Sequence, residues 1–268
     1  MADRNSRSIK SMVGLDKNYF QTKIRKLIIS FGRTLLWQLE KIISNYSAIG
    51  DALFFDPYQF DWVKDLEANY PVIRAELDNV LKYQDNLPNF QDISTDQKSI
   101  TNDDLWKTYF LYGYGIKAEG NCQRCPETTK LIENIPGMKT AFFSILLPGK
   151  HIQEHRGPYK GIIRYHLGLI VPKSKENCQI RVGNEVRSWQ EGKSLLFDDS
   201  FPHEAWNNTD SIRVILFLDI VRPIAFPVSI INNLLIELIA RSPFVKDANV
   251  NQKQWEKRLD NLVAKGDR

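Results

Sequence analysis

The chain has 268 residues, of which 43% are hydrophobic and 11% aromatic, which is enough for one substantial core and excludes an intrinsically disordered chain. Its 36 basic and 32 acidic residues leave a surplus of only four positive charges, so a nucleic-acid partner is not expected. The amino terminus lacks the apolar core of a secretion signal, and no apolar run approaches the roughly 20 residues that span a bilayer. We therefore expect a cytoplasmic protein.

The amino-terminal third is predicted to be a helical extension. Residues 1–18 are polar and are expected to be flexible, whereas residues 19–103 should pack as helices on the core. Apolar side chains recur at helical spacing through residues 20–46, and the same segment carries several lysines and arginines. This helix therefore packs on its own domain, contacts an anionic membrane peripherally or docks on a partner.

A second helical stretch is predicted from Trp62 to Leu81, with Pro71 marking a break or a first helical turn. The polar segment 84–103 is predicted to be a loop that leads into an aromatic-rich run, DLWKTYFLYGYG, at residues 104–115.

The cysteines argue against a disulfide framework, because the chain has only Cys122, Cys125 and Cys178. A reducing compartment is the simpler expectation. The first two form a CxxC motif without a second pair, which favours an ordinary loop over a local disulfide or a structural zinc site.

The β-rich core is predicted at residues 104–223. From Met138 onward, short β-like runs are separated by turn residues without intervening helices, a pattern typical of an antiparallel barrel or sandwich. Residues 224–268 should again be helical, with an apolar stripe between Ile230 and Ile239 and a frayed polar end after Asn249.

All four histidines, His151, His155, His166 and His203, lie in this β-rich region. Imidazole is a good ligand for iron, zinc and copper, and a non-haem iron site usually adds a carboxylate two residues after its first histidine. That position is Gly157 here. The sequence around His155 is therefore either no metal site or a site with two protein ligands, in which water or an anion takes the third place. His151 is expected at the surface or in a supporting role.

Two arginines are candidates for binding an anion. Arg213 lies in an apolar strand ten residues after His203, and it needs either a dicarboxylate such as 2-oxoglutarate or a protein carboxylate such as Asp219 as its partner. Strand alternation in GIIRYHLGLIV places Arg164 and His166 on one face. They line a cavity that binds cosubstrate or an acidic substrate, or they form a buried polar pair.

The stretches SILLPGKHIQEHRGPYKGIIRYHLGLIVP and WQEGKSLLFDDSFPHEAWNNTDSIRVILFLDIVRP resemble the aspartyl/asparaginyl β-hydroxylase family across residues 104–223. They are also similar to the bacterial lipid A acyl-chain hydroxylases. The resemblance implies a mainly β fold with flanking helices, namely a double-stranded β-helix of the jelly-roll or cupin-like type. It also implies a dioxygenase that uses Fe(II), O2 and 2-oxoglutarate.

By this resemblance His155 and His203 are the metal ligands, and Gly157 is expected, because the family is known for a metal site with two histidines and no carboxylate. Asp199 would orient the water that replaces the missing carboxylate, or would form a polar turn with Asp198. The resemblance further assigns 2-oxoglutarate binding to a set of side chains from several strands: Trp106, Ser144, Arg164, His166 and Arg213.

The implied reaction couples decarboxylation of 2-oxoglutarate to succinate with hydroxylation of an unactivated carbon. The leading hypothesis is hydroxylation of the β-carbon of Asp or Asn in a peptide or protein. A lipid-acyl hydroxylase is the main alternative, with residues 20–46 as its membrane contact. Small-molecule hydroxylation, halogenation at the open metal position and a non-catalytic cupin-like binding protein are further alternatives.

Overall fold

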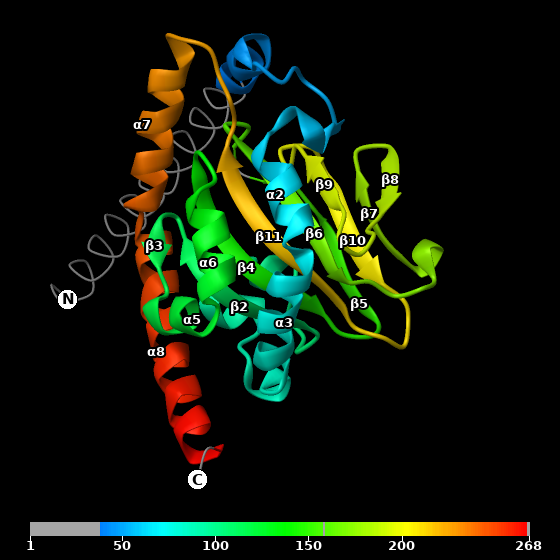
Figure 1. Ribbon diagram of the computed structural model, residues 1–268. Helices are drawn as coiled ribbons and strands as arrows, with labels where there is room; N and C mark the ends of the chain where they lie inside the picture. Colours follow the sequence, from blue (N-terminus) through cyan, green and yellow to red (C-terminus); the bar gives the residue numbers. More distant parts are fainter. Residues whose placement is uncertain (1–37, 158, 267–268) are drawn as a thin grey trace, which may run out of the picture.

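The computed structural model describes residues 38–157 and 159–266. It contains two antiparallel sheets that pack face to face, with helices on the outer side of the larger one (Figure 1). The fold is cupin-like with flanking helices, which confirms the fold class predicted from the sequence.

The larger sheet has seven strands in the order β1-β9-β6-β11-β4-β2-β3. Its bounds along the chain are β1 (Phe54–Phe55), β2 (Trp106–Gly113), β3 (Ile116–Lys117), β4 (Met138–Leu146), β6 (Ile162–Ile170), β9 (Ser194–Phe197) and β11 (Arg213–Val221). The smaller sheet has the order β5-β10-β7-β8, with β5 (Lys150–His155), β7 (Cys178–Val182), β8 (Glu185–Ser188) and β10 (His203–Asn207).

The two faces of the larger sheet bury different side chains because successive strand residues point in opposite directions. Tyr165 and Leu167 of β6 belong to the outer core, which the helices cover. His166 lies between the two sheets, beside an inner core that includes Phe142, Phe197 and Phe217. The structure therefore confirms the alternation that the sequence predicted for β6, with His166 on the opposite face from Tyr165 and Leu167.

Helices cover the outer face through their apolar stripes. Helices α2 (Trp62–Ala68) and α3 (Tyr70–Leu81) meet at Asn69, and Pro71 lies in the first turn of α3, where its missing N–H costs nothing. Figure 1 shows α2, α3 and α6 (Pro126–Glu133) in front of the larger sheet. Their buried side chains join the outer core.

Three sequence-based predictions need correction or limits. The polar segment 84–103 is not a plain loop, since it contains α4 (Phe90–Ile93) and two short 3-10 helices. The CxxC motif lies at the end of a helix and not in a plain loop, since Cys122 is in α5 (Glu119–Arg124) and Cys125 follows it. All three cysteines of the chain are free and buried. Of the helix predicted through residues 20–46, only residues 38–46 fall among the described residues, and these are helical.

The carboxyl-terminal region also differs from expectation. Helix α7 (Val228–Ala240) is followed by α8 (Pro243–Gly266), so the end after Asn249 is helical and not frayed. Leu259 is buried in the outer core, and Val263 packs against it at helical spacing. Packing of this narrow apolar stripe explains why a mostly polar sequence continues the helix.

Candidate active site

The two histidines predicted as metal ligands face each other across neighbouring strands of the smaller sheet. His155 ends β5 and His203 begins β10, and the two are direct partners in the strand pairing. Their ring centroids are 4.2 Å apart. Two imidazoles at this separation can approach one ion from the same side.

Backbone carbonyls fix the protonation of both rings. His155 Nδ1 lies 2.7 Å from the carbonyl oxygen of Gln153, and His203 Nδ1 lies 2.9 Å from that of Phe201. Because a carbonyl only accepts, each Nδ1 carries the proton, and each Nε2 keeps a lone pair. Metal-binding histidines are commonly oriented in this way, because the ring nitrogen that does not bind the metal donates a hydrogen bond to a carbonyl group. Among the described residues, His203 Nε2 is buried and has no hydrogen-bond partner.

Burial keeps the two imidazoles neutral. It lowers the pKa of His203 to about 3, with Arg164 and His155 acting in the same direction. The pKa of His155 is also lowered by burial. Neutral imidazole is the form that binds a metal ion. A divalent cation with nitrogen-ligand preference therefore fits this pair, although no group of three or more His, Cys, Asp or Glu side chains around one point occurs in the described part of the chain.

The Asp199 carboxylate lies against Gly157, beside the histidine pair. A Cβ atom built on Gly157 would overlap the carboxylate of Asp199, and the backbone N–H of Gly157 donates to the Asp199 carbonyl at 2.7 Å. The Asp199 carboxylate thus fills the space in which a side chain two residues after His155 would begin. Its Oδ1 is buried and has no partner within the described ranges. Burial raises the pKa of Asp199 to about 7, although the adjacent Arg164 cation opposes the rise.

Arg164 is already neutralised by the protein. Its guanidinium lies 2.8 Å from Asp199 Oδ2 and 3.1 Å from Asp219 Oδ1, and it stacks over the Phe217 ring at 4.5 Å. Asp219 is the cross-strand partner of Arg164 in the pairing of β11 with β6. The structure therefore places Arg164 in the site as the partner of two carboxylates, and its predicted role in binding 2-oxoglutarate stays a prediction.

Arg213 is in the opposite situation. It is 1% exposed, stacks on Trp189 at 4.5 Å and donates to the Ser144 carbonyl at 3.4 Å, while its Nε has no partner among the described groups. Asp219, the alternative partner considered from the sequence, pairs with Arg164 instead. Burial lowers the pKa of Arg213 to about 10. A buried cation without a carboxylate is costly, so this position fits an anionic ligand.

The other residues predicted to hold 2-oxoglutarate surround Arg213. Trp106 Nε1 donates to Ser144 Oγ at 3.0 Å, and both residues lie on neighbouring strands at the same end of the sheet. His166 accepts through Nδ1 from Trp189 Nε1 at 3.2 Å, and its Nε2 is buried without a partner in the described structure. His151 is not part of this group, because it is exposed and pairs with Glu204.

Two residues of the site were not predicted from the sequence as members. Trp189 connects His166 to Arg213, and Asp219 connects to Arg164. Both lie within the stretches that carry the family resemblance, but their partners are 23 to 55 residues away. Pairing at that distance depends on strand register, which the sequence does not display.

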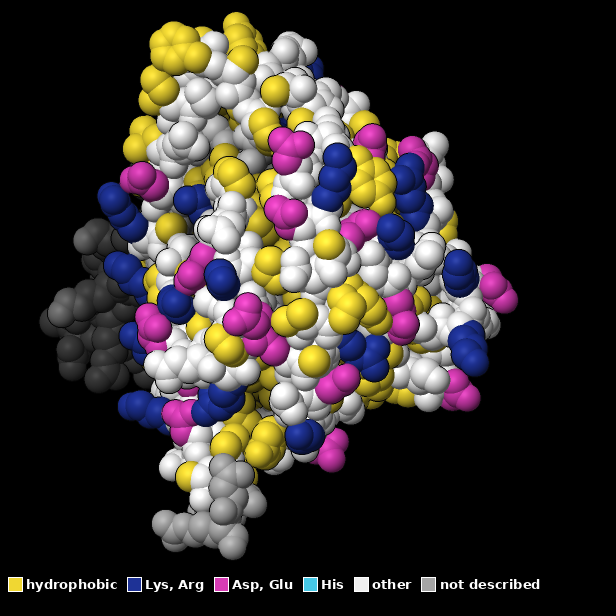
Figure 2. Space-filling view, viewed as in Figure 1, with side chains coloured by type: hydrophobic (Ala, Val, Ile, Leu, Met, Phe, Trp, Pro, Cys, Tyr) yellow, Lys and Arg dark blue, Asp and Glu magenta, His cyan; other side chains and the backbone are white. Residues whose placement is uncertain are grey.

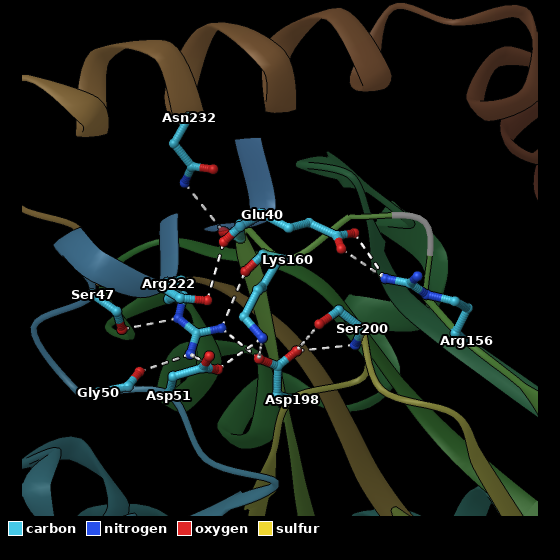
Figure 3. A network of polar contacts seen from close by, with 12 residues as sticks. Glu40, Ser47, Gly50, Asp51, Arg156, Lys160, Asp198, Ser200, Arg222 and Asn232 are labelled. Atoms are coloured by element: carbon cyan, nitrogen blue, oxygen red, sulfur yellow. Dashed lines mark hydrogen bonds and ion pairs between the residues drawn. The ribbon is translucent and has the colours of Figure 1, made fainter. Parts of the chain in front are cut away.

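The segment that carries His155 and Gly157 is held by a polar network (Figure 3). Arg156 forms an ion pair with Glu40 at 2.8 Å, and Lys160 contacts Asp198 at 3.0 Å. Asp198 also accepts from Arg222 at 2.6 Å. Adjacent Asp198 and Asp199 thus serve different purposes: the first holds Lys160, and the second lies beside Gly157 and the histidine pair.

A cavity of about 520 Å³ adjoins the site. It reaches from His155 and Arg164 to the junction of α7 and α8, and this volume is within the usual range for ligand pockets. Most of the surface that lines it is apolar and comes largely from aromatic and aliphatic side chains: Phe90, Ile93, Phe110, Tyr114, Ile116, Phe142, Phe217, Ile239, Phe244, Val245 and Ala248. Its polar lining includes Arg156, Asp219, Gln252, Lys253 and Glu256.

A family model described as aspartyl/asparaginyl beta-hydroxylase matches residues 67–223. The chain belongs to this family. It is therefore a hydroxylase of the 2-oxoglutarate oxygenase type, and membership implies Fe(II) and 2-oxoglutarate. The family and enzyme class predicted from the sequence are confirmed.

Several known proteins are similar to the chain. An ornithine lipid ester-linked acyl 2-hydroxylase of Rhizobium tropici is 49% identical over 220 residues, covering 82% of this chain and 78% of that protein. Aspartyl/asparaginyl beta-hydroxylase of Homo sapiens is 37% identical over 166 residues, covering 60% of this chain and only 21% of the human protein. Among solved structures, a Pseudomonas putida prolyl-4-hydroxylase aligns with a TM-score of 0.38 and 12% identity, over 60% of this chain and 98% of that chain.

Proposed function

We propose that this protein hydroxylates an acyl chain of a lipid, with Fe(II) bound by His155 and His203 and 2-oxoglutarate bound at Arg213. The observation that carries the substrate class is the apolar cavity, which begins at His155 and Arg164. The Rhizobium tropici relative, named as an acyl 2-hydroxylase, supports the same choice over most of both chains. This reverses the order of the two substrate hypotheses formed from the sequence.

The bound metal and 2-oxo acid supply the oxidising chemistry that hydroxylates an unactivated C–H bond, and the chain's own residues set the geometry. His155 and His203 offer their Nε2 atoms because both Nδ1 atoms donate to carbonyl groups. If a metal ion were held by these two histidines, Asp199, which fills the place beside Gly157, would orient a water there through Oδ1, which has no partner among the described groups.

The cosubstrate is positioned by its charge. Arg213 offers a bidentate guanidinium to the distal carboxylate, and the Ser144 hydroxyl and Trp106 lie beside it. Trp189 and the aromatic side chains of the inner core exclude water from this end of the site. A dry environment strengthens the ion pair between guanidinium and carboxylate.

The substrate's carbon chain is oriented mainly by apolar contacts. Phe217 and Phe142 form the cavity wall next to Arg164, and Val245 and Ala248 of α8 form the far wall. An extended alkyl chain gains about 0.8 kcal/mol for each buried CH₂ group. An Asp or Asn side chain would gain little from such walls, but the human relative keeps it as the second candidate.

A substrate panel tests the proposal. Purified protein with Fe(II), O2 and 2-oxoglutarate is given an acylated aminolipid or peptides containing Asp or Asn, and hydroxylated products are sought by mass spectrometry. We expect a hydroxylated acyl chain. Ala248→Trp should block lipid turnover by filling the cavity, whereas Ala264→Trp, at an exposed position of α8, should not. Hydroxylated peptide with unmodified lipid would overturn the proposal.

A further inference from the structure

An apolar stripe faces solvent along α7. The stripe comprises Phe226, just before the helix, and Ile230, Ile231, Leu234 and Leu238 within it, which are 77%, 60%, 49%, 58% and 55% exposed. Side chains four apart lie one above another on a helix, so the stripe forms a continuous surface. Figure 2 shows hydrophobic side chains gathered over α7 at the upper left. Exposed apolar patches of this kind mark interaction sites.

The outward direction of the stripe is fixed by the opposite side of the helix. Asn232 is 1% exposed, accepts from the Tyr159 hydroxyl at 2.7 Å and donates to the Gly161 carbonyl at 3.1 Å. Rotating α7 to bury the stripe would break both hydrogen bonds and leave buried polar groups without partners, which is costly. The stripe is therefore a feature of the packed helix.

We propose that the α7 stripe docks on the surface of a lipid bilayer, an inference that rests on the acyl-lipid function proposed above. The stripe is continuous with the substrate cavity. Ile239, next to Leu238, lines that cavity, as do Phe244 and Val245 beyond the bend between α7 and α8. An acyl chain that leaves the bilayer beside α7 therefore meets apolar side chains where it enters the cavity.

The composition of this region suits a membrane. The single charged residue of α7, Glu237, pairs with Arg241 at 3.3 Å, so little charge has to be desolvated. No single helix among the described residues is long and apolar enough to cross a bilayer; α7 and α8 together reach that composition, but they are bent by 51°. A bent pair with one exposed apolar face fits a helix that lies in the membrane interface. Exposed Arg241 and Lys246 can meet anionic headgroups.

Vesicle binding by the full-length protein tests this docking. We compare sedimentation with vesicles of phosphatidylethanolamine and phosphatidylglycerol for wild type, Ile230→Glu/Leu234→Glu and the control Val186→Glu, which changes an exposed apolar residue of β8. The double variant should lose about tenfold or more of its vesicle affinity, and the control should bind as wild type does. Equal binding by all three would overturn the docking proposal.

Two further readouts separate this proposal from its alternatives. A short-chain acyl lipid kept below its micellar concentration should be hydroxylated equally by wild type and the double variant, because the stripe does not line the cavity. If wild type does not hydroxylate it, the proposed function itself fails. A polarity-sensitive dye on Leu234→Cys should change its emission when vesicles are added. An unchanged emission, or a wild-type dimer that the double variant dissociates, would assign the stripe to protein contacts and overturn the bilayer proposal.

Discussion

Arg213 and Arg222 are both about 1% exposed, yet the structure predicts opposite outcomes when each is replaced by methionine. Arg222 donates to Asp198 at 2.6 Å, to Ser47 and to two carbonyl groups, so its removal leaves several buried acceptors unsatisfied. Losing one partner of a buried ion pair costs about 3–5 kcal/mol. At roughly 2–4 °C per kcal/mol, Arg222→Met should lower Tm by about 6 °C or more.

Arg213 has no carboxylate partner in the described part of the chain. Burial lowers its pKa from the usual 12.5 to about 10. At about 1.4 kcal/mol for each tenfold change, holding this cation in the apolar core costs on the order of 3 kcal/mol. Arg213→Met should therefore leave Tm unchanged or raise it by several degrees.

The same substitution should reduce the stabilisation by cosubstrate. Saturating 2-oxoglutarate with Mn²⁺ should stabilise wild type by about 2–3 kcal/mol at a hundredfold excess over Kd. Losing charge-assisted hydrogen bonds worth about 1.5–3 kcal/mol should weaken binding by roughly tenfold or more. At the same ligand concentration, the stabilisation of Arg213→Met should therefore fall to about half of the wild-type value or less. Differential scanning calorimetry with and without ligand measures both effects. An Arg213→Met protein that is as unstable as Arg222→Met, or that keeps the full ligand shift, would refute this reasoning.

Three further predictions concern other parts of the molecule. Gly157→Ala should displace the Asp199 carboxylate and lower turnover by about tenfold or more without unfolding the chain. The control Gly120→Ala, whose added methyl group makes ordinary contacts, should stay active. The rate of succinate release measures the turnover of both variants. Burial would raise the pKa of Glu67, but hydrogen bonds from Lys193 and Ser194 outweigh this effect and lower the pKa. Ionised Glu67 therefore stabilises the fold fully above its unfolded pKa of 4.5, and this contribution is lost as pH falls through the lower pKa of the folded state. Urea titrations between neutral and acidic pH should show a shallower acid loss in Glu67→Gln, and an unchanged slope would contradict the assignment. Cys122, Cys125 and Cys178 are buried and free, so a thiol reagent should label none of them in the native protein and all of them in urea. Rapid native labelling of Cys122 or Cys125 would show that the α5–α6 region is open.

The sequence predicted those parts of the fold that depend on local patterns. Alternation in β6 separated His166 from Tyr165 and Leu167 because a strand in a two-layer core must sort its side chains by face. Helices α2 and α3 followed from their apolar spacing and from Pro71. Helix α8 was missed beyond Asn249 because its apolar stripe is narrow and its remaining surface is polar.

The sequence predicted which residues form the site better than it predicted which of them contact each other. The histidines stood out by their clustering, and Gly157 by its position after His155. That the Asp199 carboxylate fills the place beside Gly157 depends on how two distant loops pack, which no local pattern encodes. Likewise, the sequence left Asp219 as a partner for Arg213, and only the strand register assigns it to Arg164. The cavity that favours a lipid substrate arises from α8 lying over the sheet, and α8 was not predicted in full.

The most direct test of the central claim is the source of the oxygen in a hydroxylated acyl chain. Wild-type protein is incubated with Fe(II), 2-oxoglutarate, an acylated aminolipid and heavy-isotope dioxygen, in parallel with His155→Ala and His203→Ala. We predict that mass spectrometry finds one heavy oxygen in the acyl chain and one in succinate for wild type, and neither product for the two variants. An acyl chain left unmodified while 2-oxoglutarate is consumed, or product formed equally by the histidine variants, would contradict the account.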